Sequence, residues 1–249
     1  MSDIFVTPTR INDFRSCPYK YHVRYLDGRV LEGLSRPVSK HLSLYNSIDK
    51  AIEAAAGAIN REGVGGSLLD MAALWEACFV EEGYDSERER DEWYLDGLVY
   101  LQRAIEYIRM LEATLLSPQQ ALKSRLGGLT IWGRPDLIAM QRDASINVVD
   151  FTTGKDGGEN GKELQAEIYH YLAVRRFGLD RTIRSCVVYL RTGSVYSVDL
   201  DGLIERVEQE LSRFEAELAA TRVFEPRRSP LCAFCEAKSV CPAWPGADD

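Results

Sequence analysis

Two aspartates, each at one end of a short apolar run, are the residues of this chain best suited to do chemistry. Asp136 precedes the run Leu-Ile-Ala-Met, and Asp150 closes the run Ile-Asn-Val-Val. The Val and Ile content, the short length and the polar segment between the runs predict two paired β-strands. A carboxylate at the end of an apolar strand is costly to bury unless a cation accompanies it. The two side chains, fourteen residues apart, could therefore share one Mg²⁺ or Mn²⁺ ion, and the alternative is that both cap turns at the sheet rim.

The composition is that of a soluble globular protein. The chain has 249 residues, of which 45% are hydrophobic and 27% are charged. This length suits one large domain or a domain with an insertion. The sequence has no apolar stretch as long as a membrane span and no secretion signal at its start. We therefore expect a cytoplasmic protein without a membrane partner.

The charges are distributed unevenly along the chain. The net charge of −8 argues against non-specific coating of nucleic acid. Residues 10–40 nevertheless carry seven Lys or Arg against three acidic residues, whereas residues 76–96 carry nine Asp or Glu against two Arg. A local basic face can contact phosphates while the rest of the surface stays acidic. A solvated basic helix would give the same pattern.

The periodicity of the apolar residues predicts helices up to Pro118 and a mixture of strands and helices beyond it. Helices are expected over residues 41–60, 67–83, 88–115, 164–177 and 203–220. Strands are expected over residues 120–126, 129–133, 136–140, 146–152, 183–191 and 194–199. The last two strands form a hairpin around Thr192-Gly193.

Four of the six cysteines have the spacing of a soft metal site. Cys232, Cys235 and Cys241 lie close together near the end of the chain, and Cys17 lies more than two hundred residues earlier. Four thiolates fit structural zinc or a [4Fe–4S] cluster, and the spacing alone favours zinc. The other two, at positions 78 and 186, fall in a helical and a strand pattern, so we expect core thiols there.

Three stretches together carry a family resemblance: GRPD at 133–136, VVDFTTGK at 148–155 and LQAEIYHYLA at 164–173. They resemble the PD-(D/E)xK nuclease superfamily, and within it the RecB-like exonucleases, which include CRISPR-associated members with an iron–sulfur cluster. In that family a Gly-x-x-Asp strand, an Asp-x-Lys strand and a Gln-x-x-x-Tyr helix follow in this order. The resemblance implies a restriction-endonuclease-like α/β fold. Its mixed sheet would be flanked by helices, with a helical insertion and a cluster-bearing cap formed by both termini.

The resemblance also implies metal ligands. Asp136 and Asp150 would bind Mg²⁺ or Mn²⁺, with the carbonyl of Phe151 as a further ligand. Aligning the helix around residues 51–53 with the family places Asp49 where the family has a histidine. A carboxylate at that position also suits Mg²⁺ or Mn²⁺, although a solvated helix residue is the alternative.

The resemblance reverses the preference for zinc. In the family, one cysteine before the nuclease core and three after it hold a [4Fe–4S] cluster, and Cys17, Cys232, Cys235 and Cys241 match these positions. Such a cluster would cross-link the two ends of the chain.

The implied partner is DNA, either single-stranded or at duplex ends, together with a protein partner in a DNA-processing or CRISPR-type complex. Gln165 and Tyr169, four residues apart on one helical face, would lie beside the nucleic-acid groove.

One departure from the family leaves three hypotheses open. Thr152 stands where the family has its lysine, and threonine brings no positive charge. The first hypothesis is an active metal-dependent DNA exonuclease in which Lys155 supplies the charge. The second is a catalytically weak or inactive relative that binds DNA or a protein, and the third is a zinc-stapled module with no role in nucleic-acid chemistry. The two retained carboxylates favour the first hypothesis, whereas Thr152 and Asp49 favour the second.

The sequence predicts four segments. They are an N-terminal segment with the first cluster cysteine (1–40), a helical region (41–118), the nuclease core (119–222) and a C-terminal cysteine segment (223–249).

Overall fold

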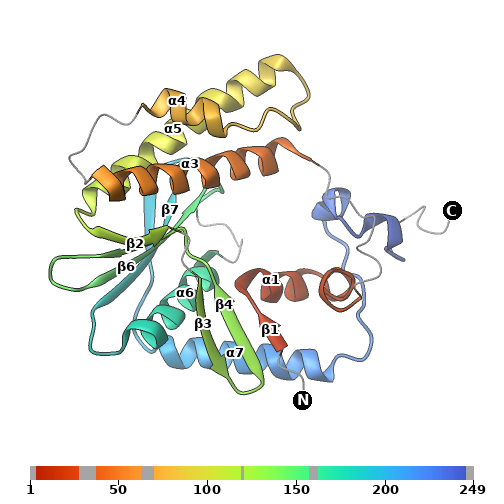
Figure 1. Cartoon of the computed structure of the whole chain (residues 1–249). Coiled ribbons are helices and arrows are strands. Elements are labelled where there is room, and N and C mark those ends of the chain that lie inside the picture. Colours follow the sequence, from red (N-terminus) through yellow and green to blue (C-terminus); the bar gives the residue numbers. More distant parts are fainter. Residues whose placement is uncertain (1–3, 28–37, 63–69, 119–120, 157–161, 245–249) are drawn as a thin grey trace. The chain divides into compact units, whose positions relative to one another are not determined.

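The computed structural model describes residues 4–27, 38–62, 70–118, 121–156 and 162–244, which form a mixed α/β fold of two sheets flanked by helices (Figure 1). This confirms the expected fold class. The chain divides into two compact units. The larger unit consists of residues 38–124 and 132–207, and the smaller unit consists of residues 1–37, 125–131 and 208–249.

The larger unit is built on a five-stranded sheet in the order β2-β5-β6-β7-β8. The strands are β2 (Thr114–Pro118), β5 (Leu137–Met140), β6 (Ile146–Thr152), β7 (Ile183–Tyr189) and β8 (Ser194–Ser197). The central strand β6 is antiparallel to β5 and parallel to β7. A parallel pair needs a crossover connection, and helix α6 (Lys162–Phe177) lies in that connection.

Helices cover both faces of this sheet (Figure 1). On one face lie α3 (Lys40–Glu62), α4 (Met71–Cys78) and α5 (Glu87–Met110). Val149 and Phe151 of β6 belong to the core that these three helices form with the sheet. Successive strand residues point to opposite faces, so Asp150 lies on the other face, the one against which α6 packs.

The smaller unit contains both chain ends. Its elements are β1 (Ile4–Val6), α1 (Pro8–Ser16), α2 (Pro18–Tyr21), a π-helical turn (His22–Leu26) and two 3₁₀ turns (Pro230–Phe234 and Lys238–Val240). Strand β1 pairs in parallel with β4 (Leu129–Gly133) in a sheet of order β1-β4-β3, where β3 is Leu122–Leu126. Helix α7 (Leu203–Ala220) brings Phe214 edge-to-face against Phe14 at 5.6 Å between ring centroids. These rings form part of the core of the smaller unit.

The predicted strand pair, the helix before β7 and the hairpin at Thr192-Gly193 are confirmed. The helix expected to run to residue 115 was wrong at its end, because α5 stops at Met110 and β2 follows. Glu112 has a φ of 46°, which turns the chain out of the helix. The helix expected over 67–83 is shorter, since α4 ends at Cys78, and its predicted residues 67–69 lie outside the described residues.

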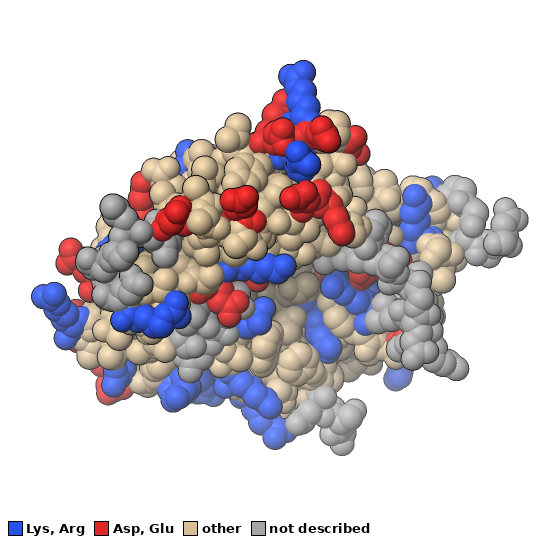
Figure 2. All heavy atoms as spheres, turned by 45° about the horizontal axis from the view of Figure 1, so that its top comes forward, with Lys and Arg blue, Asp and Glu red and all other residues tan. Residues whose placement is uncertain are grey.

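Acidic side chains gather over the segment that carries α4 and α5, in the upper part of Figure 2. They are Glu76, Glu81, Glu82, Asp85, Glu87, Glu89, Asp91, Glu92 and Asp96. A surface of this charge repels the phosphates of nucleic acid. In the described parts of the chain, no helix combines the length and the apolar character needed to cross a lipid bilayer.

Candidate active site

The pairing of β5 with β6 brings the two predicted carboxylates together. Leu137 pairs with Val149 in the antiparallel register. Extending this register by one residue places Asp136 opposite Asp150. Residues directly opposite each other on antiparallel strands have side chains on the same face. A short hairpin therefore explains how two aspartates fourteen residues apart come to share one site.

Burial makes the negative charges of this pair mutually unfavourable. Asp150 is 4% exposed. Burial, followed by the charge of Asp150, raises the pKa of Asp136 well above its ordinary value, and Asp49 on α3 adds a smaller effect in the same direction. The N–H of Phe151 donates a 2.6 Å hydrogen bond to Asp136 Oδ2, which acts in the opposite direction. Two carboxylates held in this way favour a bound cation.

Lys162, the first residue of α6, contacts Asp150 of this pair directly. Its Nζ lies 3.0 Å from Asp150 Oδ2 and donates to Gln165 Oε1 at 3.2 Å. Burial lowers the pKa of Lys162, but the attraction of Asp150 and Asp136 outweighs it, so the pKa lies above its ordinary value. Lys162 is thus a charged partner of the buried carboxylates.

Gln165 and Tyr169 share one face of α6, as their spacing predicted, and Gln165 on that face contacts Asp150. Gln165 Nε2 contacts Asp150 Oδ1 at 2.9 Å and the Tyr169 hydroxyl at 3.0 Å. Tyr169 is only 7% exposed, and a Cβ atom on Gly133 would lie 2.7 Å from its ring. The glycine of the GRPD stretch is therefore needed because the tyrosine ring packs directly against the backbone of β4. The buried ring offers little surface for base stacking.

Neither Thr152 nor Lys155 forms an ion pair with Asp150 among the described residues, and the catalytic role of Lys155 stays a prediction. The Oγ1 atom of Thr152 accepts a 3.1 Å hydrogen bond from the N–H of Gly154. Lys155 is exposed and makes no hydrogen bond or ion pair with the residues that the structure describes. Among the residues that the structure describes, the cation in contact with Asp150 is Lys162, which the sequence analysis missed. Its position three residues before Gln165 and seven before Tyr169 places it on their helical face and could have revealed it.

The donor set of the site is a carboxylate pair rather than a complete cage. Over the described ranges, no three His, Cys, Asp or Glu side chains are close enough together to hold a metal ion. Mg²⁺ is commonly bound through one or two protein carboxylates, so Asp136 and Asp150 fit such an ion. Asp49 lies on α3, and its ligand role stays a prediction, as does that of the Phe151 carbonyl.

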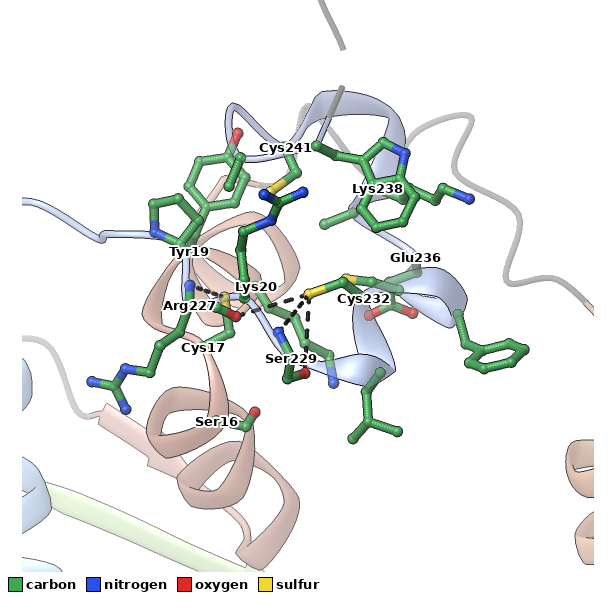
Figure 3. A pocket seen from close by; sticks show the side chains of 18 of the residues that line it. Ser16, Cys17, Tyr19, Lys20, Arg227, Ser229, Cys232, Glu236, Lys238 and Cys241 are labelled. Carbon is green, nitrogen blue, oxygen red and sulfur yellow. Dashed lines mark hydrogen bonds between the residues drawn. The ribbon is translucent and has the colours of Figure 1, made fainter. Parts of the chain in front are cut away.

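The four predicted cluster cysteines line a single cavity of about 230 Å³ in the smaller unit (Figure 3). Cys17 lies at the junction of α1 and α2, and Cys232 lies within the first 3₁₀ turn. Cys235 directly follows this turn, and Cys241 directly follows the second. Backbone N–H groups point at two of the sulfurs, from Arg227 to Cys17 at 3.3 Å and from Ser229 to Cys232 at 3.2 Å.

Side chains join the two walls of this cavity. The Tyr19 hydroxyl donates to the carbonyl of Val240 at 2.6 Å. Arg24 bridges Asp13 at 2.8 Å and Glu236 at 3.1 Å, and Asp13 is 6% exposed. The N-terminal and C-terminal segments are therefore held together by direct contacts around the cysteines.

The remaining two thiols pack as expected. Cys78 and Cys186 lie against the core of the larger unit, and Cys186 is 3.1 Å from the hydroxyl of Tyr107. All six cysteines are free thiols.

Comparison with known proteins identifies the family. The family model described as the PD-(D/E)XK nuclease superfamily matches residues 6–242. A Eubacterium rectale protein that is provisionally described as an exonuclease has the same fold, with a TM-score of 0.53 at 14% identity over 94% of this chain and 87% of that one. SSO0001 is 15% identical over 88% of this chain and 98% of that one, and its TM-score of 0.39 is too low to carry an argument. No curated protein matches this sequence. The chain belongs to the PD-(D/E)XK nuclease superfamily.

Proposed function

We propose that this protein is a metal-dependent DNA exonuclease of the RecB-like type. The observation that carries the proposal is the pairing of half-buried Asp136 with buried Asp150. Burial and the charge of Asp150 raise the pKa of Asp136, and both effects favour a bound cation. Membership of the nuclease superfamily supports a nucleic-acid substrate. DNA that is single-stranded, or the end of a duplex, is the proposed substrate form.

The residues of the chain have distinct parts in this proposal. Asp136 and Asp150 hold Mg²⁺ or Mn²⁺, which when bound polarises a phosphate and lowers the pKa of an attacking water. Phe151 orients Asp136 through its N–H group, and Gln165 orients Asp150. The acidic surface over α4 and α5 disfavours approach of DNA from that side.

Cleavage of labelled DNA tests this proposal. A linear single-stranded oligonucleotide, a blunt duplex and a circular single strand are incubated with Mn²⁺, with Mg²⁺ or with a chelator. We expect the linear substrates to be degraded only with metal and the circle, which has no end, to persist. Asp136→Asn should abolish cleavage because it removes a charged oxygen ligand. Cleavage in chelator, or by Asp136→Asn at the parent rate, would refute metal-dependent catalysis, and degradation of the circle would refute the exonuclease.

We also propose that Cys17, Cys232, Cys235 and Cys241 hold a [4Fe–4S] cluster in a reducing, cytoplasmic environment. The four thiols line one cavity of about 230 Å³, which supports a shared metal centre. The resemblance to the RecB-like exonucleases favours the cluster over zinc. Iron and zinc analysis of anaerobically purified protein tests this, and a finding of zinc without iron would exclude the cluster.

Thr152 supports a second candidate, a weak or inactive homologue that binds DNA or a partner in a DNA-processing or CRISPR-type complex. The hydroxyl of Thr152 is engaged by Gly154 and brings no charge. DNA binding without cleavage under every metal condition would favour this candidate.

A further inference from the structure

The strand position that carries a lysine in Asp-x-Lys proteins holds no cation in this chain. Thr152 occupies it, and its Oγ1 accepts the N–H of Gly154 in the turn that ends β6. The negative charge that develops on the phosphoryl oxygens during cleavage would therefore not be stabilised by a positive side chain at this position of β6. The question is which other residue brings a charge to the buried carboxylates.

Helix α6 brings that charge. Lys162 lies ten residues after Thr152 in the sequence, yet its Nζ is 3.0 Å from Asp150 Oδ2. The Lys162 side chain is 25% exposed, whereas that of Asp150 is 5% exposed. The Lys162 side chain is therefore more accessible to solvent than the carboxylate that it contacts.

The hydrogen bonds of Lys162 leave it the capacity to bind a substrate group. An ammonium has three N–H donors. Asp150 and Gln165 accept two of them, at 3.0 and 3.2 Å. Within the described residues, no acceptor takes the third donor. Gln165 also forms hydrogen bonds with Asp150 and Tyr169. The position of the Lys162 side chain is therefore fixed by partners that are themselves hydrogen-bonded.

We propose that Lys162 is a catalytic residue that replaces, from helix α6, the lysine missing at Thr152. This inference rests on the nuclease function proposed above. During hydrolysis a water oxygen bonds to phosphorus, and the bond from phosphorus to one sugar oxygen breaks. The water gives a proton to solvent and the leaving oxygen takes one up, so a phosphate monoester and a hydroxyl result. Lys162 remains protonated and stabilises the negative charge that grows on the phosphoryl oxygens.

A structural salt bridge is the alternative role for the same contact. Lys162 could simply neutralise Asp150 and keep the site folded, because an unpaired buried carboxylate is destabilising. The two roles predict different effects on the cleavage rate when the positive charge is moved from position 162 to position 152. A lysine returned to position 152 would restore catalysis only if the charge itself is what the reaction needs.

The experiment compares cleavage of a 5′-labelled single-stranded oligonucleotide with Mn²⁺ by four proteins: the parent, Lys162→Met, Lys123→Met and the double variant Thr152→Lys/Lys162→Met. Lys162→Met should slow cleavage by about 10² or more, in line with the loss of one preorganised stabilising group. Lys123→Met, the matched control at an exposed lysine of β3, should leave the rate unchanged. The double variant should be at least about tenfold faster than Lys162→Met.

Two further measurements separate the outcomes. Binding of Mn²⁺ by paramagnetic resonance and the thermal unfolding midpoint should persist in Lys162→Met. A Lys162→Met protein that cleaves like the parent, that loses Mn²⁺ binding together with activity, or that gains nothing from Thr152→Lys overturns the catalytic role of Lys162. Asp136→Asn tests the function separately: if it also cleaves like the parent, the proposed nuclease site fails and this inference fails with it.

Discussion

Asp136 is a residue whose charge destabilises the metal-free fold. Burial and the neighbouring Asp150 raise its pKa, so its ionised form is disfavoured in the folded protein. Asp136→Asn keeps an oxygen acceptor for the N–H of Phe151 and removes the repulsion. We expect the metal-free variant to be more stable than the parent, and to lose the gain in midpoint that Mn²⁺ gives the parent. Thermal unfolding with and without Mn²⁺ measures both effects.

Asp143 provides the control for this substitution. It lies in the turn between β5 and β6, where hydrogen bonds from Ser145 lower its pKa. Asp143→Asn should therefore not raise the midpoint and should keep the response to Mn²⁺. An Asp136→Asn protein that is less stable than the parent without metal would contradict the proposed repulsion.

His170 gives the fold a dependence on acid. Burial lowers the pKa of His170 from 6.5 to about 4, and its Nδ1 lies 3.0 Å from Ser185 Oγ. Between these values the unfolded chain binds a proton that the folded chain does not. The stability that comes from neutral His170 is thus present above about pH 6.5 and is lost as the pH falls toward 4. The loss is on the order of 1–3 kcal/mol.

Denaturant unfolding between pH 7 and pH 4 tests this assignment. His170→Gln should flatten the fall in the free energy of unfolding, because glutamine does not titrate. His41→Gln, at an exposed histidine of α3, should leave the slope as in the parent. Equal slopes in all three proteins would show that other groups cause the acid sensitivity.

The contact between β4 and α6 depends on the absence of a side chain at Gly133. A Cβ atom there would meet the Tyr169 ring at 2.7 Å and Leu172 Cδ1 at 2.9 Å. Gly133→Ala should therefore lower the free energy of unfolding by about 1–3 kcal/mol, the range for overpacking, and displace Tyr169 from Gln165. Gly57→Ala is the matched control: its Cβ would lie 3.6 Å from the end of Arg61, so it should stabilise α3 by about 0.5–1 kcal/mol. Two variants of equal stability would contradict the close packing.

The sequence predicted the elements that carry a strong local pattern. The apolar run after Asp136 forms β5, and the apolar run before Asp150 forms β6. The spacing of Gln165 and Tyr169 predicted the face of α6 that meets Asp150. Strand β2 was missed because its apolar residues continue the helical period of α5. The chain turns out of the helix at Glu112, whose positive φ cannot be predicted from a glutamate in the sequence. Lys162 was missed because its approach to Asp150 depends on how α6 packs against the sheet.

For the molecule as a whole, the sequence predicted that the two ends of the chain meet, but only through the cysteines. The structure adds contacts that need no metal, from Tyr19 to Val240 and from Arg24 to both Asp13 and Glu236. Tyr19 and Arg24 carried no recognisable spacing, since Val240 and Glu236 lie more than two hundred residues away from them along the chain. The role of the four cysteines as cluster ligands stays a prediction.

A cluster bound by Cys17 and by the three C-terminal cysteines would close a loop of more than two hundred residues. Closing so long a loop lowers the conformational entropy of the unfolded chain. In the cross-link model this raises the free energy of unfolding by about 3–5 kcal/mol. Iron-loaded parent protein should therefore unfold at a higher temperature than iron-depleted protein. Cys17→Ala should lose iron and this difference together, since three thiolates remain and the link between the ends is broken.

The contacts around the cavity decide how far stability falls without the cluster. Tyr19 and Arg24 still join the two segments in Cys17→Ala, so its midpoint should equal that of the iron-depleted parent rather than fall below it. Tyr19→Phe removes the 2.6 Å hydrogen bond to Val240 and should lower the midpoint in both the loaded and the depleted protein. Cys78→Ala is the control for loss of a thiol, and it should keep the iron content of the parent because Cys78 packs against the core of the larger unit. Calorimetry with iron analysis measures both quantities, and a Cys17→Ala protein with the iron and midpoint of the parent would show that the ends are not linked through Cys17.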